Sequence, residues 1–92
     1  MDRMGAIGLF VRVVDAGSFS AVARTLSVGQ PAVSKQIAAL EAYLGAQLLQ
    51  RTSRSLTLTE AGRDFYESGV RLLGDLEAAE SRVGRGAVAP SG

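Results

Sequence analysis

Apolar residues recur at helical spacing near the start of the chain and predict a first helix over residues 2–16. Asp2 suits the N-cap position, and Gly17 suits the position just after the last turn. The run 9–14 also fits a buried strand, but the length of the segment and its end residues favour the helix. The expected core stripe consists of Met4, Ile7, Phe10 or Val11, and Val14.

Two further segments of helical periodicity are separated by a short turn. The first, 19–26, follows Ser18 as N-cap. The second, 30–44, carries Pro31 in its first turn, where the missing N–H would have no partner, and it ends at Gly45. Two helices joined by so tight a turn predict a helix-turn-helix. The expected buried stripes are Phe19, Val22, Ala23 and Leu26 in the first helix, and Val33, Ile37, Leu40 and Leu44 in the second.

The pattern then changes to two short β segments, 48–51 and 56–58, around a polar tip. A hairpin in this place is typical of a wing. Thr59 next caps a long helix that we expect to run to Val83, with an apolar seam at coiled-coil spacing. We expect the first half of this helix to pack on the domain and the second half to face a partner. The seam consists of Gly62, Phe65, Gly69, Leu72, Leu76, Ala79 and Val83.

These elements predict a mainly α fold with a small β-hairpin, namely a winged helix-turn-helix followed by a long dimerisation helix. Residues 1–59 form the expected winged helix-turn-helix domain, 60–84 the dimerisation helix and 85–92 a flexible, glycine-rich tail. The 92 residues fit one small domain, and domains of this size are often stabilised by oligomerisation.

Composition removes several classes of function. The chain has no Cys and no His, which excludes disulfides, the usual zinc sites and nucleophiles that depend on either residue. We therefore expect no enzyme and no cofactor, and we interpret Glu60, Asp64 and Glu67 as a solvated helix face. No apolar run approaches the roughly 18 residues of a membrane helix. With no signal-peptide pattern either, we expect a cytoplasmic protein without a membrane partner.

Charge is distributed unevenly along the chain. Residues 1–17 are neutral, 18–59 hold four cations against one acid, and 60–92 hold four cations against six acids. The middle segment is therefore suited to face an anion, although a random scatter of charges is the alternative interpretation.

The outward side of the helix over 30–44 has small residues, one cation and no carboxylate, unlike an ordinary solvated face. Small side chains allow a helix to lie deep in the major groove of DNA. Lys35 can donate to guanine or phosphate, Gln30 can pair with adenine, and Ser34 can serve a base edge or a phosphate. The high helix propensity of alanine is the alternative explanation for this face. Its residues are Pro31, Lys35, Ala38 and Ala42, flanked by Ala32, Ser34 and Ala39.

Phosphate contacts are expected around the same helix, whose free N–H groups favour an anion. At the wing, Arg54 can enter the minor groove, where the negative potential attracts arginine; a solvated loop arginine is the alternative. Arg24 can reach a phosphate or pair with Glu41. The serines before the two inner helices can instead act as caps only. The expected phosphate contacts are Ser18, Ser27, Gln36, Arg51 and Ser53.

Several motifs, in order and at matching spacing, resemble the N-terminal domain of LysR-type transcriptional regulators. They are SFSAVARTL at 18–26, QPAVSKQI at 30–37, Leu40-Glu41, Leu44-Gly45, Leu48, Arg51 and LTEAG at 58–62. The resemblance covers about residues 3–85, and the ordered series is highly specific although no single motif is decisive.

The resemblance implies sequence-specific binding of double-stranded DNA by a dimer, on an interrupted inverted repeat. It places Gln30, Pro31, Ser34 and Lys35 in the major groove and Arg54 on a wing in the minor groove. It also implies that the long helix pairs antiparallel with its twin. The resulting dimer interface comprises Phe65, Leu72, Leu76, Ala79 and Val83.

The chain departs from the family pattern in four ways. Gly29 stands where Ser or Thr is common, Lys35 where Arg is frequent, and Leu49 where Phe is usual. Lys binds as a point charge, which weakens a bidentate contact to guanine. The chain also lacks the effector-binding domain of such regulators, so we expect it to be a piece of a longer protein. A small-molecule effector and contact with RNA polymerase are expectations for that parent only. A protein-interaction module and a small enzyme are the rival interpretations.

Overall fold

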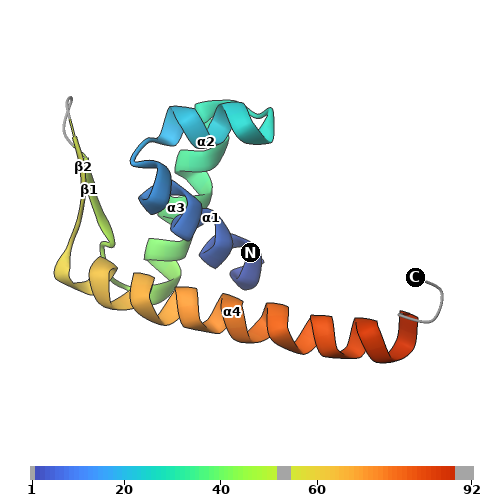
Figure 1. Ribbon diagram of the computed structural model, residues 1–92. Helices are drawn as coiled ribbons and strands as arrows, with labels where there is room; N and C mark the ends of the chain where they lie inside the picture. Colours follow the sequence, from blue (N-terminus) through green and yellow to red (C-terminus); the bar gives the residue numbers. More distant parts are fainter. Residues whose placement is uncertain (1, 52–54, 89–92) are drawn as a thin grey trace.

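The computed structural model describes residues 2–51 and 55–88. Three helices precede a two-stranded hairpin and a long C-terminal helix in this part of the chain, which confirms the predicted fold class. Figure 1 shows their arrangement. The elements are α1 (Arg3–Ala16), α2 (Phe19–Leu26), α3 (Gln30–Leu44), β1 (Leu49–Arg51), β2 (Leu56–Leu58) and α4 (Glu60–Val88).

The predicted starts of α1, α2 and α4 and the predicted ends of α1 and α3 are confirmed by their capping residues. The side chains of Asp2, Ser18 and Thr59 each accept a hydrogen bond from the backbone N–H three residues further on, at 3.2, 3.1 and 2.9 Å. Gly17 and Gly45 take left-handed conformations, with φ of 69° and 70°, where glycine has no steric penalty. The chain reversals that create the helix-turn-helix are thus encoded locally.

α1 packs against all three other helices, and α4 runs along the base of the bundle formed by α1, α2 and α3 (Figure 1). The expected core stripe of α1 was only partly right, because Met4 is 37% exposed while Ala6, Leu9 and Val13 are buried. α1 is covered on more than one side, so its apolar residues do not mark a single stripe. The buried core consists of Ala6, Leu9, Phe10, Val13, Phe19, Val22, Ala23, Val33, Ile37, Leu40, Leu48 and Leu49.

Two other expected core residues lie at the rim. Leu26 is 41% exposed and Leu44 is 38% exposed, although both fall on the predicted apolar stripes. Each occupies the last turn of its helix. Periodicity predicts the face on which a residue lies but not where the facing element ends, which explains both errors.

The first half of α4 approaches the domain closely. A Cβ atom added to Gly62 would lie 1.9 Å from the carbonyl oxygen of Leu48, so no larger residue fits there without a backbone shift. At Gly69 the added atom would lie 3.2 Å from Cγ2 of Ile7. The predicted division of α4 into a packed half and a projecting half agrees with these contacts.

α4 continues to Val88, beyond Val83, where we expected it to end. Glycine lowers helix stability by about 1 kcal/mol relative to alanine but meets no steric bar to helical geometry, so Gly84 does not by itself end the helix. Residues 85–88 of the expected tail therefore belong to α4, and residues 89–92 lie outside the described part of the chain.

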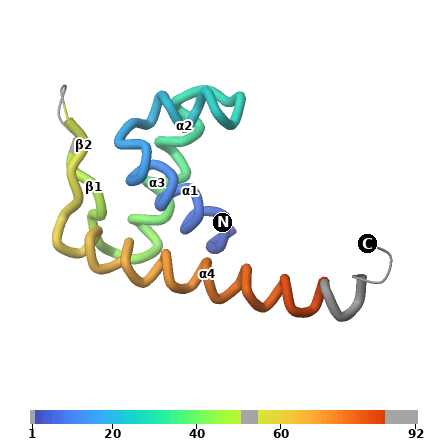
Figure 2. The backbone as a smooth tube through the Cα atoms, viewed as in Figure 1, coloured from blue at the N-terminus to red at the C-terminus, as the bar shows by residue number. Residues whose placement is uncertain are grey.

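The two strands pair antiparallel, with Leu49 opposite Leu58 and Arg51 opposite Leu56. Figure 2 shows the hairpin and α2 on the same side of α4. The N-terminal end of α3 also lies on that side, because its C-terminal end leads toward α4 (Figure 2). The hairpin and the start of α3 are therefore both directed away from the long helix.

Candidate nucleic-acid interface

The sequence pattern of α3 predicts its two sides correctly. Val33, Ile37 and Leu40 are buried, while Lys35 and the small residues on the other side are exposed. Ser34 is half-buried and engaged in an interaction of its own. The exposed residues of α3 other than Leu44 in its last turn, here called the α3 outer face, are Gln30, Pro31, Ala32, Lys35, Gln36, Ala38, Ala39, Ala42 and Tyr43.

The single carboxylate of α3 does not reach the α3 outer face. Oε2 of Glu41 accepts hydrogen bonds from the backbone N–H groups of Leu48 and Leu49, at 2.8 and 3.1 Å. Glu41 thus holds the chain where it leaves α3 and enters the hairpin. Arg24 and Glu41 are both described, and no ion pair joins them, so the pairing that we considered from the sequence is not present.

A second set of bonds secures the base of the hairpin. The hydroxyl of Thr59 donates to the carbonyl of Gln47 at 2.6 Å, and the N–H of Thr59 donates to the carbonyl of Leu48 at 3.0 Å. The side-chain amide of Gln47 donates to the carbonyl of Leu49 at 3.0 Å. The hairpin is therefore fixed relative to both α3 and α4. Sequence reasoning missed this function of Glu41, whose partners lie seven and eight residues away, and of the Gln47 carbonyl, whose partner Thr59 lies twelve residues away.

The start of α3 leaves backbone donors open to solvent. Gly29 is the N-cap and offers no side-chain cap, and a Cβ there would meet Cδ of Pro31 at 3.6 Å, an ordinary contact. Ser27 is exposed and has a positive φ of 58°. Ser18 caps α2, with its hydroxyl 3.0 Å from that of Ser20. The capping role of Ser18 is thus observed, and a phosphate contact stays a prediction.

The wing residues are only partly described. β1 and β2 place the hairpin beside the core, where Leu56 and Leu58 are half-buried and pack against it. Ser53 and Arg54 lie outside the described residues, as does the side chain of Arg51. The predicted contacts of these three residues therefore stay predictions.

The expected dimer interface separates into two parts. Phe65 packs within its own chain, with its ring centroid 5.8 Å from that of Phe10, so the expectation that it faces a partner is not supported. Leu72, Leu76 and Val83 are instead exposed by 47, 40 and 68%. Ala79 is half-buried beside them. An apolar stripe of this size on a projecting helix is costly to leave in water.

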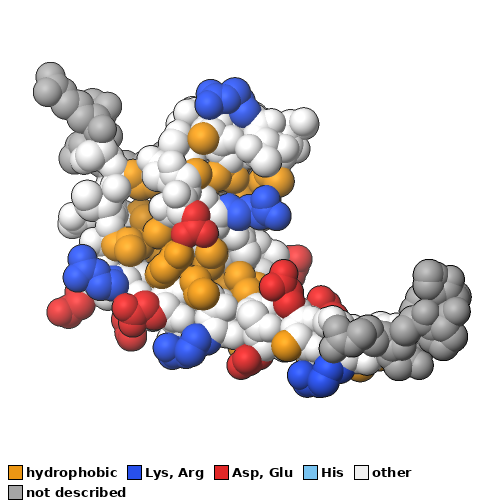
Figure 3. Space-filling model, viewed as in Figure 1, with side chains coloured by type: hydrophobic (Ala, Val, Ile, Leu, Met, Phe, Trp, Pro, Cys, Tyr) orange, Lys and Arg blue, Asp and Glu red, His pale blue; other side chains and the backbone are white. Residues whose placement is uncertain are grey.

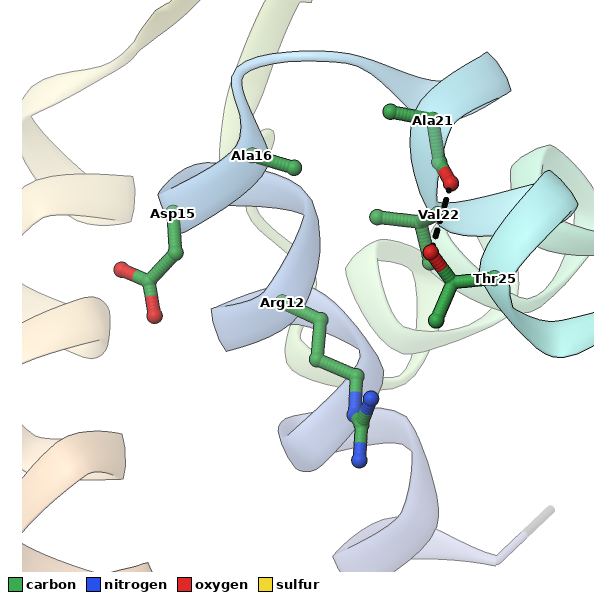
Figure 4. Close-up of a pocket in the computed structure, with 6 residues that line it drawn as sticks. All are labelled: Arg12, Asp15, Ala16, Ala21, Val22 and Thr25. Carbon is green, nitrogen blue, oxygen red and sulfur yellow. Dashed lines mark hydrogen bonds between the residues drawn. The ribbon is translucent and has the colours of Figure 1, made fainter.

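An open hollow of about 350 Å³ lies between α1 and α2, and Figure 4 shows the residues that line it. The side chains of Arg12 and Asp15 point away from one another, and Thr25 turns its hydroxyl to the carbonyl of Ala21 at 3.1 Å (Figure 4). No cluster of three potential metal ligands occurs among residues 2–51 and 55–88. Nor does any helix in the described part of the chain combine the length and hydrophobicity that crossing a membrane requires.

Comparison with known proteins agrees with this geometry. The model of the bacterial regulatory helix-turn-helix proteins of the lysR family matches residues 4–63. An HTH-type transcriptional regulator of Xanthomonas campestris is 45% identical over 84 residues, which are 91% of this chain and 24% of the relative. An HTH-type transcriptional repressor of Pseudomonas aeruginosa is 38% identical over 92 residues, 100% of this chain and 29% of the relative. The chain thus spans about a quarter of the length of these relatives.

Solved structures resemble the whole described architecture. The BenM DNA-binding domain, in a complex with catB site 1 DNA, superimposes with a TM-score of 0.87 at 38% identity, covering 92% of this chain and 96% of that one. The CbnR DNA-binding domain, in its DNA complex, superimposes with a TM-score of 0.83 at 37% identity, covering 91% of this chain and 97% of that one. From its sequence motifs, its winged helix-turn-helix and these matches, the chain belongs to the lysR family of bacterial transcriptional regulators, which are not enzymes.

Proposed function

We propose that this chain binds double-stranded DNA sequence-specifically, as a dimer on an interrupted inverted repeat, with α3 in the major groove and the hairpin reaching the minor groove. The α3 outer face carries this proposal. It is exposed and consists mainly of small side chains, with Lys35 and Tyr43, and the one carboxylate of α3, on Glu41, binds the backbone of Leu48 and Leu49 instead. A helix with such a face can approach base edges closely.

The arrangement of the elements supports the same function. The start of α3 lies on the side of the molecule away from α4, and the hairpin extends from the start of α4 toward that side (Figure 2). A duplex on that side meets both elements while α4 stays free. The open N–H groups at Gly29 and Gln30 are suited to a phosphate. The structural similarity to two domains solved in complexes with DNA supports DNA binding.

The exposed stripe of Leu72, Leu76, Ala79 and Val83 supports dimerisation through α4. Antiparallel pairing of two α4 helices relates the two domains by a two-fold axis, and a two-fold dimer reads an inverted repeat. Because bacterial DNA lies in the cytoplasm, the proposed function implies that location. Effector binding and contact with RNA polymerase are proposed only for a longer parent protein.

The test is selection of bound duplexes from a random pool, followed by titration of the best sequence at several salt concentrations. We expect an enriched motif with two inverted halves and an affinity that falls steeply with salt, because phosphate contacts release counterions. The same titration on a scrambled duplex is the control. Failure to enrich any sequence, or equal affinity for the scrambled duplex, would overturn sequence-specific binding.

A further inference from the structure

Glu41 binds both ends of the connection between α3 and the hairpin. Its carbonyl oxygen accepts hydrogen bonds from the N–H groups of Gly45 and Ala46, at 2.8 and 3.2 Å, where α3 ends. Its side-chain atom Oε2 accepts from the N–H groups of Leu48 and Leu49, at 2.8 and 3.1 Å, where β1 begins. One residue of α3 therefore fixes both the end of the helix and the start of the strand.

The packing of the two elements makes this connection important. α3 packs mainly on α1 and α2, whereas β1 and β2 pack mainly on one another, and β2 packs on α4. The other side chains that hold the base of the hairpin, Gln47 and Thr59, lie beside the strands and not on α3. Glu41 instead holds the start of β1 from α3 itself.

The charge of Glu41 lies far from the expected position of the DNA. Glu41 is eleven residues beyond Gln30, which corresponds to roughly 16 Å along the helix axis. It is also the one acid between residues 18 and 59. Figure 3 shows acidic side chains along α4 and over α1 but none over α2 on the visible face. An effect of Glu41 on recognition is therefore exerted through the position of the hairpin.

A single oxygen atom of Glu41 accepts both bonds from the start of the hairpin, so position and charge can be separated. Glutamine has one carbonyl oxygen at the same distance from the backbone and can accept both bonds without the charge. Aspartate keeps the charge, but its side chain is shorter by about 1.5 Å and cannot reach both amides. Binding groups must be held to within about 0.5 Å, so this shortening is large enough to displace the hairpin.

We propose that Glu41 is a positioning residue for DNA recognition, which holds the hairpin at one offset from α3 and so determines which base pairs beside the α3 site add to specificity. The inference rests on the proposed function and names a specificity determinant that touches no DNA. A protein gains from two adjacent grooves only when its two reading elements keep the spacing of the duplex. Without the bonds of Glu41, α3 keeps its packing on α1 and α2 and reads its own bases, while the hairpin loses its fixed offset.

The test compares the wild-type chain with Glu41→Gln and Glu41→Asp by selection from a random duplex pool, followed by titration of duplexes with single base-pair changes. All three should prefer the same bases at the centre of each half-site, where α3 binds. A change in the flanking pairs should weaken binding of wild type and Glu41→Gln by roughly tenfold, and of Glu41→Asp by less than about twofold. Flanking preference kept by Glu41→Asp, lost equally by Glu41→Gln, or missing in the wild type would each overturn the positioning role.

A stability control separates positioning from general weakening of the fold. Val13→Ala removes part of a fully buried side chain in α1, away from the connection that Glu41 holds. It should lower the free energy of unfolding in urea but leave the flanking preference unchanged. An equal loss of flanking preference in Val13→Ala would reduce Glu41 to a stabilising residue. Circular dichroism verifies that all variants are folded.

A measurement without DNA keeps failure of this inference apart from failure of the proposed function. Residual dipolar couplings of the amides of Gln50 and Thr57, compared with those of α3, report the orientation of the hairpin in the free chain. The orientation should be that of the wild type in Glu41→Gln and altered or averaged in Glu41→Asp. Unchanged couplings in Glu41→Asp would overturn the role of Glu41, whereas a wild-type chain that enriches no duplex would overturn sequence-specific binding.

Discussion

The hydroxyl of Tyr66 donates a hydrogen bond to the carboxylate of Asp15 at 2.5 Å, joining α4 to the end of α1. This bond raises the pKa of Tyr66 above its ordinary value of 10.0, with desolvation and the charge of Asp15 adding to the effect. The bond connects residues 51 positions apart and ties the long helix to the DNA-binding domain.

The stabilising effect of Tyr66 should therefore depend on pH. A raised pKa means that the folded state favours the protonated phenol, so the contribution is present below about pH 10 and is lost as pH rises through the folded pKa. Near neutral pH, the wild-type protein should have a higher free energy of unfolding in urea than the Tyr66→Phe variant, and this difference should shrink at alkaline pH. In a Tyr43→Phe background, phenolate absorbance reports Tyr66 alone. Asp15→Asn should lower the pKa of Tyr66, and an unchanged pKa of Tyr66 would contradict this account.

Gly62→Ala should destabilise the fold by about 2–4 kcal/mol, because the new Cβ would lie 1.9 Å from the carbonyl oxygen of Leu48 and one backbone must move. Urea unfolding measures the loss. Gly84→Ala is the matched control, since a Cβ there meets nothing within 4 Å, and it should be neutral or slightly stabilising. Equal effects of the two substitutions would show that close packing at Gly62 is unimportant.

Glu41→Ala should destabilise the protein by about 1–3 kcal/mol, because the backbone N–H groups of Leu48 and Leu49 lose their shared acceptor. Glu41→Gln keeps one carbonyl oxygen and should lose less. Hydrogen exchange at the two amides is the direct measurement, and it should accelerate in the alanine variant. Unchanged exchange would mean that Glu41 does not hold the entry to the hairpin.

Lys35→Ala should lower affinity for the selected duplex by about 1–3 kcal/mol, with a smaller loss on a scrambled duplex, as expected for a base contact. Arg71→Ala, on α4, is the matched charge control and should leave discrimination unchanged. Fluorescence anisotropy on both duplexes supplies the comparison. An equal loss on both duplexes would assign Lys35 to a phosphate instead of a base.

Leu76→Asp should convert the dimer to monomers while the domain stays folded, because Leu76 is 40% exposed within one chain and its burial requires a partner. Ala78→Asp, at an exposed position two residues along α4, is the control. Sedimentation gives the mass and circular dichroism the helix content. A Leu76→Asp variant that remained dimeric would place the interface elsewhere.

The sequence predicts helix ends well because capping is local. Ser18 and Thr59 each bond an amide three residues away, and Gly45 ends α3 by its own conformation. The α3 outer face was also predictable, since one helix is buried on one side and exposed on the other. The buried stripe of α1 was not predictable in full, because α1 packs on several helices. Met4 lies on the expected stripe but is exposed.

The remaining differences arise from contacts between distant segments. Gly62 fits a coiled-coil seam by its spacing, but the position requires glycine because the backbone of Leu48 leaves no room for a Cβ atom. Phe65 fits the same seam but packs on Phe10 in its own chain. No sequence pattern around Glu41 indicates that its carboxylate accepts hydrogen bonds from two amides seven and eight residues later. Which atoms lie opposite a helix is a tertiary property that spacing alone does not encode.

The bonds of Thr59 and the glycine contact at Gly62 attach α4 rigidly to the hairpin and to the end of α3. In a dimer joined through α4, the geometry of the helix then sets the separation of the two winged helix-turn-helix domains. Each residue inserted between Gly62 and Leu72 adds about 1.5 Å and turns the partner by about 100°. Insertions or deletions of whole helical turns in α4 should therefore preserve the relative orientation of the two domains far better than insertions or deletions of single residues.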